Sequence, residues 1–398
     1  MHRSILAVGL VFGLLVAGAA SALQMTDFAV FSQNKTSLGT NVAVYGGPVG
    51  SNNEVVVNGA SEIIFSLLGG GLLSGGTNID VGGNIVFNGD VTINGGSDIH
   101  GNVDSSGDIS LGTNVHVYGN LTGAGNVTVN GASIVDGNAL AGGNFSTGTN
   151  VLMKGTIGAN GSVHLGGSTT VLGAITYGTT FTTGSGATYP SATRGSVVVN
   201  PVTFSPVAIP AATSFSAGGP DYSLGGGSSL VLPPGVYGDL VMGSNCDLYL
   251  SAGTYYFDKI QLGGGTDIFI DLSGGLLDIF VVNNLNFGTN VDMFLANGDA
   301  SDIYVEVTGD ATINGGSTWF GTVFASGSRV SFGTNCDITG AVYSSDRIVI
   351  NGGSTINFVL ADRLQGGPPG EVIPEPATLA LLGLGLIGLA GRRLRGRK

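Results

Sequence analysis

The sequence predicts an all-β fold, a parallel β-helix (β-solenoid) with coils of about 18 residues. Three observations lead to this prediction. Two short phrases alternate along the chain, short apolar runs alternate with polar residues at period two, and glycine supplies 72 of the 398 residues. Charged residues make up only 10% of the chain and hydrophobic residues 42%, which is typical of a folded core with many tight corners rather than of disorder.

The two alternating phrases set the period. One reads LGTNVHVYGN from Leu111, and its copies begin at Leu38, Thr147, Phe287 and Phe332. The other reads INGGSDIHGN from Ile93, and its copies begin at Val129, Ile313 and Ile350. Taking the Ser or Thr after the turn glycine as a marker, Ser61, Ser97 and Ser133 lie 36 residues apart, and a threonine marker falls between each pair. Half of this double repeat is one coil.

Each coil has room for three short strands and three corners. Runs such as NVTVN (126–130) and DIYVEV (302–307) turn one face inward, where Val, Ile, Leu and Phe stack on the coil above. Glycine and asparagine suit the corners because they tolerate positive φ. One asparagine column is expected either to stack as an amide ladder or to serve only as a turn. Its members are Asn41, Asn78, Asn114, Asn150, Asn290 and Asn335.

Two other repeat folds fit less well, and the handedness of the β-helix is left open. A propeller blade needs ~40–45 residues without a half-period. Calcium-binding nonapeptide repeats need GGxGxDxUx in tandem. The nearest stretch here, GGTNIDVGG from Gly75, keeps Asp80 but has Asn78 and Gly82 at two required positions, and it does not recur in tandem.

The period divides the body into two solenoid segments, 23–180 and 235–364. Between them, 181–234 holds seven prolines among Thr, Ser and Ala, which predicts an extended excursion or linker. The markers resume in the second segment with looser spacing. The spacing does not decide whether the two segments form one rod or two packed solenoids.

Residues 1–22 have the three parts of a secretory signal peptide. Met1-His2-Arg3 is a positive start, 5–19 is apolar, and Ala20-Ser21-Ala22 is a small-residue cleavage site. An uncleaved membrane anchor is the alternative. The charge before the apolar run and the small residues after it favour export.

The other end of the chain also has an ordered series of signals. A Gly/Pro hinge over 365–373 precedes the motif Pro374-Glu375-Pro376, which opens the segment 374–398. An apolar run of 14 residues, 377–390, follows; it is shorter than the ~20 residues of an untilted membrane helix, but basic flanks can snorkel. By the positive-inside rule this flank stays cytoplasmic. Its members are Arg392, Arg393, Arg395, Arg397 and Lys398.

This tail resembles the PEP-CTERM sorting signal of Gram-negative bacteria, over 372–398. The resemblance implies recognition and removal of the tail by an exosortase, a membrane cysteine protease-like enzyme, in a family associated with exopolysaccharide and biofilm. It implies a protein at the outer face of the inner membrane during processing, then at the cell surface or in the extracellular matrix. Residues 233–364 resemble bacterial surface and pilus-associated β-solenoids, and are distantly similar to bactofilins and to the ice-binding adhesin β-helix.

Candidate catalytic groups are scattered. Among the basic residues of the body only Arg329 and Arg347 lie one coil apart; with Asp337 and Asp346 nearby they predict a solvated ion pair rather than a catalytic groove. The histidines His100, His116 and His164 have no metal-binding spacing and are expected as single surface side chains. We expect no catalytic residue, no metal site and no bound cofactor.

The two cysteines occupy matching phrases, GSNCDLYL and GTNCDITG. Cys246 and Cys336 would lie four coils apart, roughly 19 Å at ~4.8 Å per strand, beyond the ~7 Å limit for a disulfide. We therefore expect two small buried thiols in the place of Val.

The body is strongly acidic once the two ends are set aside. Residues 23–364 hold 7 basic and 24 acidic residues. Such a surface repels nucleic acid and anionic lipid, and allows only diffuse cation binding, such as calcium.

The sequence therefore predicts a non-enzymatic, exported structural or adhesive protein. Its expected partners are an exosortase-type enzyme, extracellular polysaccharide, the membrane through the C-terminal helix before processing, and further copies through open solenoid ends. One alternative is an ice-binding protein, for which the marker column supplies one hydroxyl per coil but no paired T-x-T rows. Another is a polysaccharide-active β-helix enzyme that uses Arg329 or Arg347.

Overall fold

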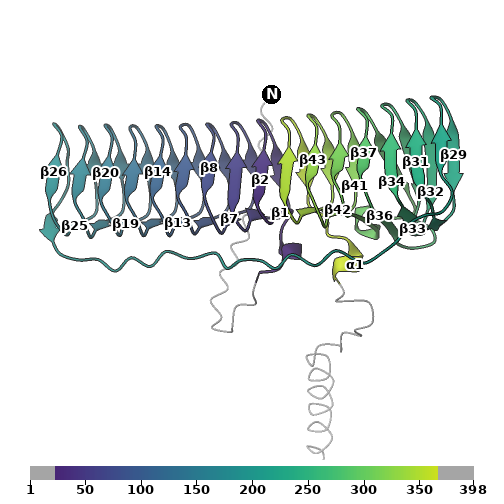
Figure 1. Cartoon of the computed structure of the whole chain (residues 1–398). Helices are drawn as coiled ribbons and strands as arrows, with labels where there is room; N and C mark the ends of the chain where they lie inside the picture. The colour runs from purple at the N-terminus through teal and green to yellow at the C-terminus, as the bar shows by residue number, and fades with distance from the viewer. Residues whose placement is uncertain (1–22, 366–398) are drawn as a thin grey trace, which may run out of the picture.

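The computed structural model describes residues 23–365, which form one long rod of stacked coils with three parallel sheets along its sides (Figure 1). Sheets A and B have 16 strands each and sheet C has 15, and neighbouring strands within each sheet pair in parallel. The predicted parallel β-solenoid is confirmed. The predicted signal peptide, the motif Pro374-Glu375-Pro376 and the basic flank lie outside the described residues.

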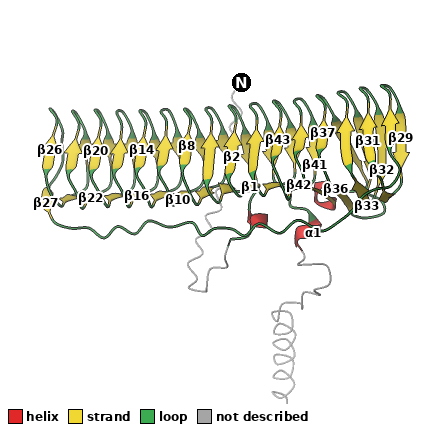
Figure 2. Ribbon diagram, viewed as in Figure 1, coloured by secondary structure: helices red, strands yellow, loops and turns green. Residues whose placement is uncertain are grey.

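Helices are short within the described residues (Figure 2). They are η1 (Met25–Asp27), η2 (Ala300–Asp302) and α1 (Asp362–Gln365). Within 23–365 no helix is both long enough and apolar enough to cross a bilayer.

The strands succeed one another in the order A, B, C around each coil. Sheet A contains β1 (Val30–Ser32), β4 (Val49–Ser51), β7 (Leu67–Gly69), β10 (Ile85–Phe87), β13 (Val103–Ser105), β16 (Leu121–Gly123), β19 (Ala139–Ala141), β22 (Ile157–Ala159), β25 (Ile175–Tyr177), β27 (Ala192–Arg194), β30 (Gly235–Val236), β33 (Gly253–Phe257), β36 (Leu277–Val281), β39 (Ile303–Val307), β42 (Thr322–Ala325) and β45 (Val342–Ser344). Sheet B contains β2 (Lys35–Leu38), β5 (Glu54–Val57), β8 (Leu73–Gly75), β11 (Val91–Ile93), β14 (Ile109–Leu111), β17 (Val127–Val129), β20 (Phe145–Thr147), β23 (Val163–Leu165), β26 (Phe181–Thr183), β28 (Tyr222–Leu224), β31 (Asp239–Met242), β34 (Lys259–Leu262), β37 (Leu285–Phe287), β40 (Ala311–Ile313), β43 (Val330–Phe332) and β46 (Arg347–Ile350). Sheet C contains β3 (Ala43–Tyr45), β6 (Glu62–Ile63), β9 (Asp80–Val81), β12 (Asp98–Ile99), β15 (His116–Val117), β18 (Ile134–Val135), β21 (Leu152–Met153), β24 (Thr170–Val171), β29 (Ser229–Leu232), β32 (Asp247–Ser251), β35 (Asp267–Asp271), β38 (Asp292–Ala296), β41 (Thr318–Phe320), β44 (Asp337–Thr339) and β47 (Thr355–Asn357).

The two halves of the chain form one continuous rod, joined at a seam where the first coil (β1–β3) stacks on the last coil (β45–β47). Strand β1 pairs with β4 on one side and with β45 on the other. Strands β2 and β3 pair in the same way with β46 and β47. The described chain thus starts near the middle of the rod's length and runs to the end at β26 and β27. It then crosses to the opposite end, at β28, and returns to the seam (Figure 1).

A strap, residues 195–221, carries the chain along the rod on the outer side of sheet A (Figures 1 and 2). Asn52 and Asn88 hold it by bonding both the N–H and the C=O of one strap residue each, Val207 and Phe204, at 2.7–2.9 Å. Thr213 donates its N–H and its hydroxyl to the buried carboxylate of Glu306. These side chains on the outer side of sheet A satisfy backbone groups of the strap that a neighbouring strand would otherwise bond.

The excursion predicted over 181–234 is shorter than expected. Strands β26, β27, β28 and β29 lie inside that range, and only 195–221 has no regular structure. All seven prolines stand outside the strands, where no ladder N–H is needed. Those at 190, 233 and 234 also lie outside the strap, so they mark corners or the entry to a strand rather than an interruption.

The spacing of the Ser and Thr markers has a structural explanation. Thr113 is exposed at its corner, whereas Ser97 is buried; its Oγ accepts from the N–H of Ile79 and donates to the carbonyl of Asn94. In the next coil, which carries the GTN phrase, the position of Ser97 is occupied by the buried Val115, 18 residues later. The markers thus belong to two columns, and the expectation of one displayed hydroxyl per coil is wrong.

The asparagine column, for which an amide ladder and a turn were both left open, is a column of left-handed corners, as the turn alternative predicts. All six members have φ between 54° and 60°. In the neighbouring coils the same corner holds a small residue, such as Ala60 or Gly96. A Cβ on Gly96 would lie 2.2 Å from Oδ1 of Asn78, so two long side chains do not fit in adjacent coils here. This alternation creates the 36-residue double repeat and rules out a continuous ladder.

Asparagine ladders do form at the other two corners. At the C-to-A corner, Oδ1 of Asn84, Asn102, Asn120 and Asn138 accepts the backbone N–H found 18 residues later, at 2.8–2.9 Å. At the A-to-B corner, Oδ1 of Asp90, Asp108, Asn126 and Asn144 accepts the corresponding N–H at 2.6–2.9 Å. Glycine precedes each ladder residue because coils approach closely; a Cβ on Gly119 would lie 2.4 Å from the carbonyl oxygen of Gly101.

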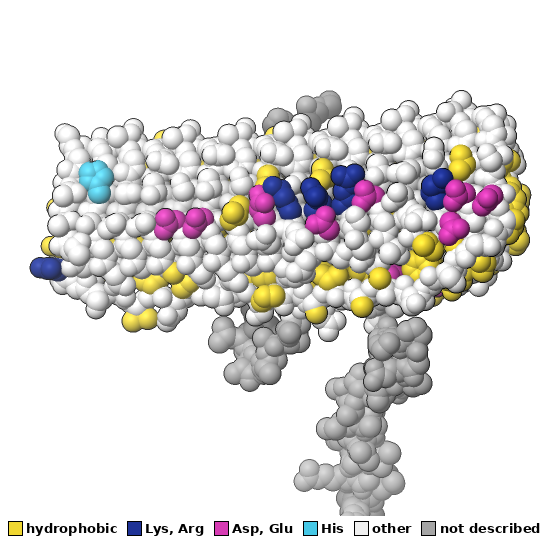
Figure 3. Space-filling model, in the orientation of Figure 1, with side chains coloured by type: hydrophobic (Ala, Val, Ile, Leu, Met, Phe, Trp, Pro, Cys, Tyr) yellow, Lys and Arg dark blue, Asp and Glu magenta, His cyan; other side chains and the backbone are white. Residues whose placement is uncertain are grey.

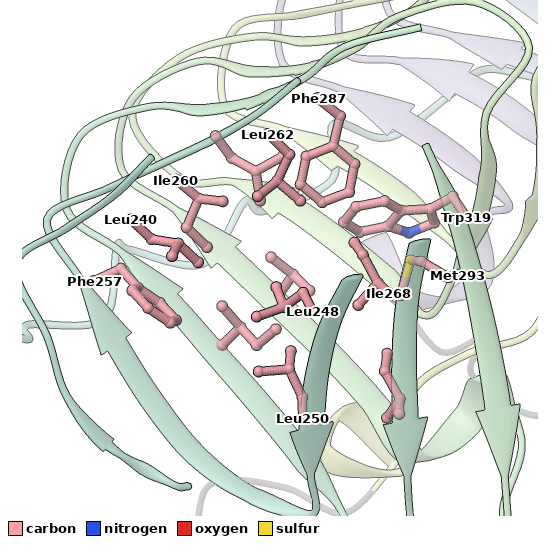
Figure 4. A pocket seen from close by; sticks show the side chains of 14 residues that line it. Leu240, Leu248, Leu250, Phe257, Ile260, Leu262, Ile268, Phe287, Met293 and Trp319 are labelled. Atoms are coloured by element: carbon pink, nitrogen blue, oxygen red, sulfur yellow. The ribbon is translucent and has the colours of Figure 1, made fainter. Parts of the chain in front are cut away.

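The core is the inside of the coils, filled by stacked Val, Ile, Leu and Phe. Cys246 and Cys336 belong to it as free, buried thiols at the entrances of β32 and β44, four strands apart in sheet C. In the wider coils near β28 a small apolar cavity of about 30 Å³ remains (Figure 4). Its lining includes Leu248, Phe257, Met293 and Trp319 and exposes no polar atom, so it is a packing void rather than a ligand site.

Candidate binding faces on sheets B and C

The outer face of sheet C carries a grid of aromatic and acidic side chains on β32, β35 and β38. The alternating strand sequences DLYLS, DIFID and DMFLA turn the first, third and fifth residues outward. We call the following residues the aromatic–acidic face: Asp247, Tyr249, Asp267, Phe269, Asp271, Asp292 and Phe294.

The three rings of this face stack as a ladder. Tyr249 and Phe269 have centroids 4.9 Å apart and Phe269 and Phe294 5.3 Å apart, with planes within 18°. Tyr249 is 38% and Phe294 47% exposed, and an open hollow of about 320 Å³ lies over the rings. Because the faces of the rings are used in stacking, the ladder offers their edges to a partner.

Beside the rings, Asp247, Asp267 and Asp292 occupy directly opposite positions on neighbouring strands. Burial, then the charges of Asp292 and Asp247, raise the pKa of Asp267. The pKa of Asp271 is shifted in the opposite direction. The Asn297 amide and the Ser273 N–H donate hydrogen bonds to its carboxylate and lower its pKa. Within 23–365 none of these four carboxylates forms an ion pair with a basic side chain.

Two of the histidines come together on sheet C, which the sequence analysis missed. Tyr118 stacks between His100 and His116, with centroids 4.7 and 3.8 Å away. Each histidine contacts an aspartate at 3.2 Å, Asp80 and Asp136 respectively. Only the 18-residue register, which places His100 opposite Tyr118, could have signalled this cluster. His164 lies apart on sheet B and contacts Thr182.

The part of the chain that the structure describes contains no group of three or more His, Cys, Asp or Glu side chains arranged to hold a metal ion.

Sheet B displays two adjacent rows of small polar side chains. One row contains Thr92, Ser110, Thr128 and Ser146 at strand centres, and the other is the ladder Asp90, Asp108, Asn126 and Asn144. The signal in the sequence is Asp or Asn, one apolar residue, then Ser or Thr, repeated every 18 residues. Paired polar rows thus exist on sheet B, but one member of each pair is an Asp or Asn, so they are not the T-x-T rows whose absence was expected.

A short row of basic residues crosses the seam on sheet B, near the middle of the face seen in Figure 3. Lys35 lies directly opposite Arg347, with Arg329 in the next coil. Each has a carboxylate partner at 2.8–3.2 Å: Glu54 for Lys35, Asp346 for Arg347 and Asp310 for Arg329. Asp337, expected nearby, lies on sheet C instead, because β44 and β46 belong to different sheets. Three exposed ion pairs form here rather than a groove with convergent groups.

Comparisons with known proteins identify the tail. Residues 372–395 match the family model described as the PEP-CTERM protein-sorting motif. A search of curated proteins found no match. Among solved structures, the chain is similar to an ice binding protein from an Antarctic bacterium, Flavobacteriaceae, at 17% identity, with 87% of this chain and 98% of that chain covered and a TM-score of 0.24. A score this low carries no argument about this chain. The motif indicates an exported, surface-localised protein that is processed by an exosortase-type enzyme.

Proposed function

We propose that this chain is a non-enzymatic structural or adhesive rod of the cell surface or extracellular matrix that contacts polysaccharide through the aromatic–acidic face. The observation that carries the proposal is the repetition of one Asp and one aromatic side chain on each of β32, β35 and β38. The repeat of ~4.8 Å along the rod suits a polymer that lies along the rod axis.

The chemistry of this face fits a saccharide. The ring edges of Tyr249, Phe269 and Phe294 offer apolar surface to the C–H groups of a sugar. The carboxylates of Asp247, Asp267 and Asp292 accept hydrogen bonds from hydroxyl or amine groups, and such charge-assisted bonds are stronger than neutral ones. The sorting motif supports the same proposal, because an exported protein at the cell surface can meet extracellular polysaccharide.

Binding of the full-length chain to a glycan array, with and without calcium, tests this proposal. We expect the variant Phe269→Ser/Phe294→Ser to lose at least tenfold in affinity for the glycans that the unmodified chain binds. The matched control Ile134→Ser/Leu152→Ser removes two outward apolar side chains from β18 and β21 of the same sheet and should retain binding. Equal loss in both variants, or no glycan bound by the unmodified chain, would contradict the proposal.

Ice binding is the second candidate, favoured by the paired rows on sheet B. Their spacing of ~4.8 Å between strands, and of two residues along each strand, forms a regular flat lattice of polar groups that could order water. If this function holds, the chain shows thermal hysteresis, and Thr128→Lys, in the centre of the row, abolishes most of it. An absence of hysteresis in the unmodified chain removes this candidate.

No specific observation favours a polysaccharide-active enzyme. That function would need Arg329 and Arg347 in a groove with several carboxylates. Each instead pairs with a single aspartate on the outer surface of sheet B.

A further inference from the structure

The strap carries no charged residue from Gly195 to Pro220. It runs almost the full length of the rod, from the coil of β22, where the N–H of Val197 bonds Asn160, to the end at β28. Most of its side chains face outward; Val198 is 78% and Val202 59% exposed. One side of an otherwise acidic rod is thus an uncharged strip of Val, Ala, Pro, Ser and Thr.

The acidic groups of sheet A do not break this pattern. Glu306 is 1% exposed and Asp104 7%, and both accept hydrogen bonds from strap residues. Asp278 is bound by Arg363 at 2.6 Å. Sheets B and C, in contrast, display rows of exposed or half-exposed carboxylates, including Asp90, Asp108 and the aromatic–acidic face.

The C-terminal end of the described chain leaves on the same side as the strap. Helix α1 is held there by the Arg363–Asp278 ion pair and by stacking of Arg363 over Phe280 and Tyr304 at 4.9 and 5.1 Å. The N–H of Ala361 also bonds Thr322. These contacts place the exit between β36 and β42, two to four strands from the rod end at β30.

The reach of the chain beyond Gln365 limits how the rod can sit on a membrane. Residues 366–376 separate α1 from the apolar segment that begins at Ala377, and they span at most roughly 36–40 Å when fully extended. The end at β27 lies 11 to 13 strands from the exit, roughly 53–62 Å at ~4.8 Å per strand. The rod therefore cannot stand on that end while 377–390 is held in a bilayer.

We infer that the strap is the surface that faces the bilayer, so that the rod lies flat with sheets B and C turned away. This inference rests on the membrane stage of sorting expected from the sequence, in which 377–390 is held in the membrane. Anionic headgroups repel the carboxylate rows of sheets B and C, whereas the uncharged strap meets no repulsion. Its exposed valines and prolines add weak interfacial contact.

Depth-dependent quenching in vesicles tests the inference on the full-length chain. Single cysteines at Val198 on the strap, His164 on β23 and Val231 on β29 carry an environment-sensitive fluorophore; the native Cys246 and Cys336 are buried. The vesicles contain phosphatidylethanolamine, phosphatidylglycerol and a headgroup nitroxide lipid. Val198 and His164 lie at nearly the same position along the rod but on different faces of it. A difference in quenching between them therefore reports which face is turned to the bilayer.

We expect at least twofold stronger quenching at Val198 than at His164. Strong quenching at Val231 alone would show a rod standing on the end at β28, and equal quenching at Val198 and His164 would show no preferred face; either result overturns the inference. Flotation of the vesicles separates this failure from that of the proposed sorting stage, because a chain that does not float has no inserted tail.

Introduction of negative charge on the strap supplies a second measurement, which uses one label position for all variants. Val198→Asp/Val202→Asp should lower quenching of a label at Ala212, further along the strap, by at least half. The control Thr170→Asp/Leu172→Asp places the same charge on the outer side of sheet C in the same region of the rod and should leave that signal unchanged. An equal effect of both variants would contradict the inference.

Discussion

The hydroxyl of Tyr343 donates a 2.8 Å hydrogen bond to the carbonyl oxygen of Phe28, and so ties the last coil to the first. Both residues are fully buried, on the side of sheet A where η1 and α1 pack. Burial raises the pKa of Tyr343, so the phenol stays protonated and remains a donor. The seam is thus closed by a side chain as well as by strand pairing.

Removal of this hydroxyl should weaken the seam. Tyr343→Phe leaves the buried carbonyl of Phe28 without that partner, which typically costs about 1–3 kcal/mol. The measurement is urea unfolding followed by far-ultraviolet circular dichroism. Tyr249→Phe removes a phenol hydroxyl from an exposed ring and should change stability by less than about 0.5 kcal/mol. Similar effects of the two variants would show that the seam bond contributes little.

Close stacking of coils at the glycine corners predicts that the stability lost on a Gly→Ala substitution depends strongly on its position. Gly119→Ala would place a Cβ 2.4 Å from the carbonyl oxygen of Gly101, and backbone cannot rotate away as a side chain can. We expect a loss of roughly 1–3 kcal/mol, typical of overpacking. Gly225→Ala, where a Cβ meets nothing within 4 Å, should be close to neutral. Thermal unfolding of the two variants compares them directly.

Two aspartates on β35 should respond to pH with opposite sign. Because the pKa of Asp267 is raised, its ionised form destabilises the fold above that pKa, and Asp267→Asn should raise the unfolding midpoint at pH 7. The pKa of Asp271 is lowered, so its charge stabilises the fold above the ordinary pKa of 3.8, and Asp271→Asn should lower the midpoint at pH 7. The difference at Asp267 should shrink as the pH falls through its raised pKa towards 3.8, whereas the difference at Asp271 should shrink only as the pH falls below 3.8. Midpoints that move in the same direction at pH 7 would contradict this assignment.

Arg194 should limit end-to-end association of rods. It continues a column whose earlier members include the buried Ala141 and Ala159, and it therefore places a charge over the open end of the solenoid, with its Nε bonded to the carbonyl of Gly178. Charges at inward positions are a common protection of exposed strand edges. Arg194→Val should produce concentration-dependent oligomers in light scattering, while Arg329→Val, on the side of the rod, should not.

Local features of the fold were predictable because they depend on neighbours about one coil away. Glycine before a ladder asparagine, positive φ at Asn78 and buried apolar residues at period two are all properties of one coil and the next. The structural role of each column of residues was harder to predict. For Asn78 the sequence left a ladder and a turn open, and Asn84 and its relatives form the ladder instead; both types of asparagine recur with similar spacing, and only the corner geometry separates them.

The candidate faces were predictable only in part. The pair of Arg329 and Arg347 follows from their 18-residue spacing, but Asp337 was assigned to the wrong side because strand boundaries decide which sheet a residue joins. The stacking of His100, Tyr118 and His116 depends on a register that one residue of slip would remove. The aromatic–acidic face lies where coils lengthen to five-residue strands, so its period differs from the clear repeat of the first half.

The sequence by itself determined the coil: its length, its corners, its inward residues and the sorting signal that follows it. Only the tertiary structure decided the order in which coils stack, the seam between β1–β3 and β45–β47, and the course of the strap over sheet A. The physical reason is that repeated coils offer nearly the same edge to any neighbour. Contacts between residues about 315 positions apart, such as Phe28 and Tyr343, leave no periodic trace in the chain.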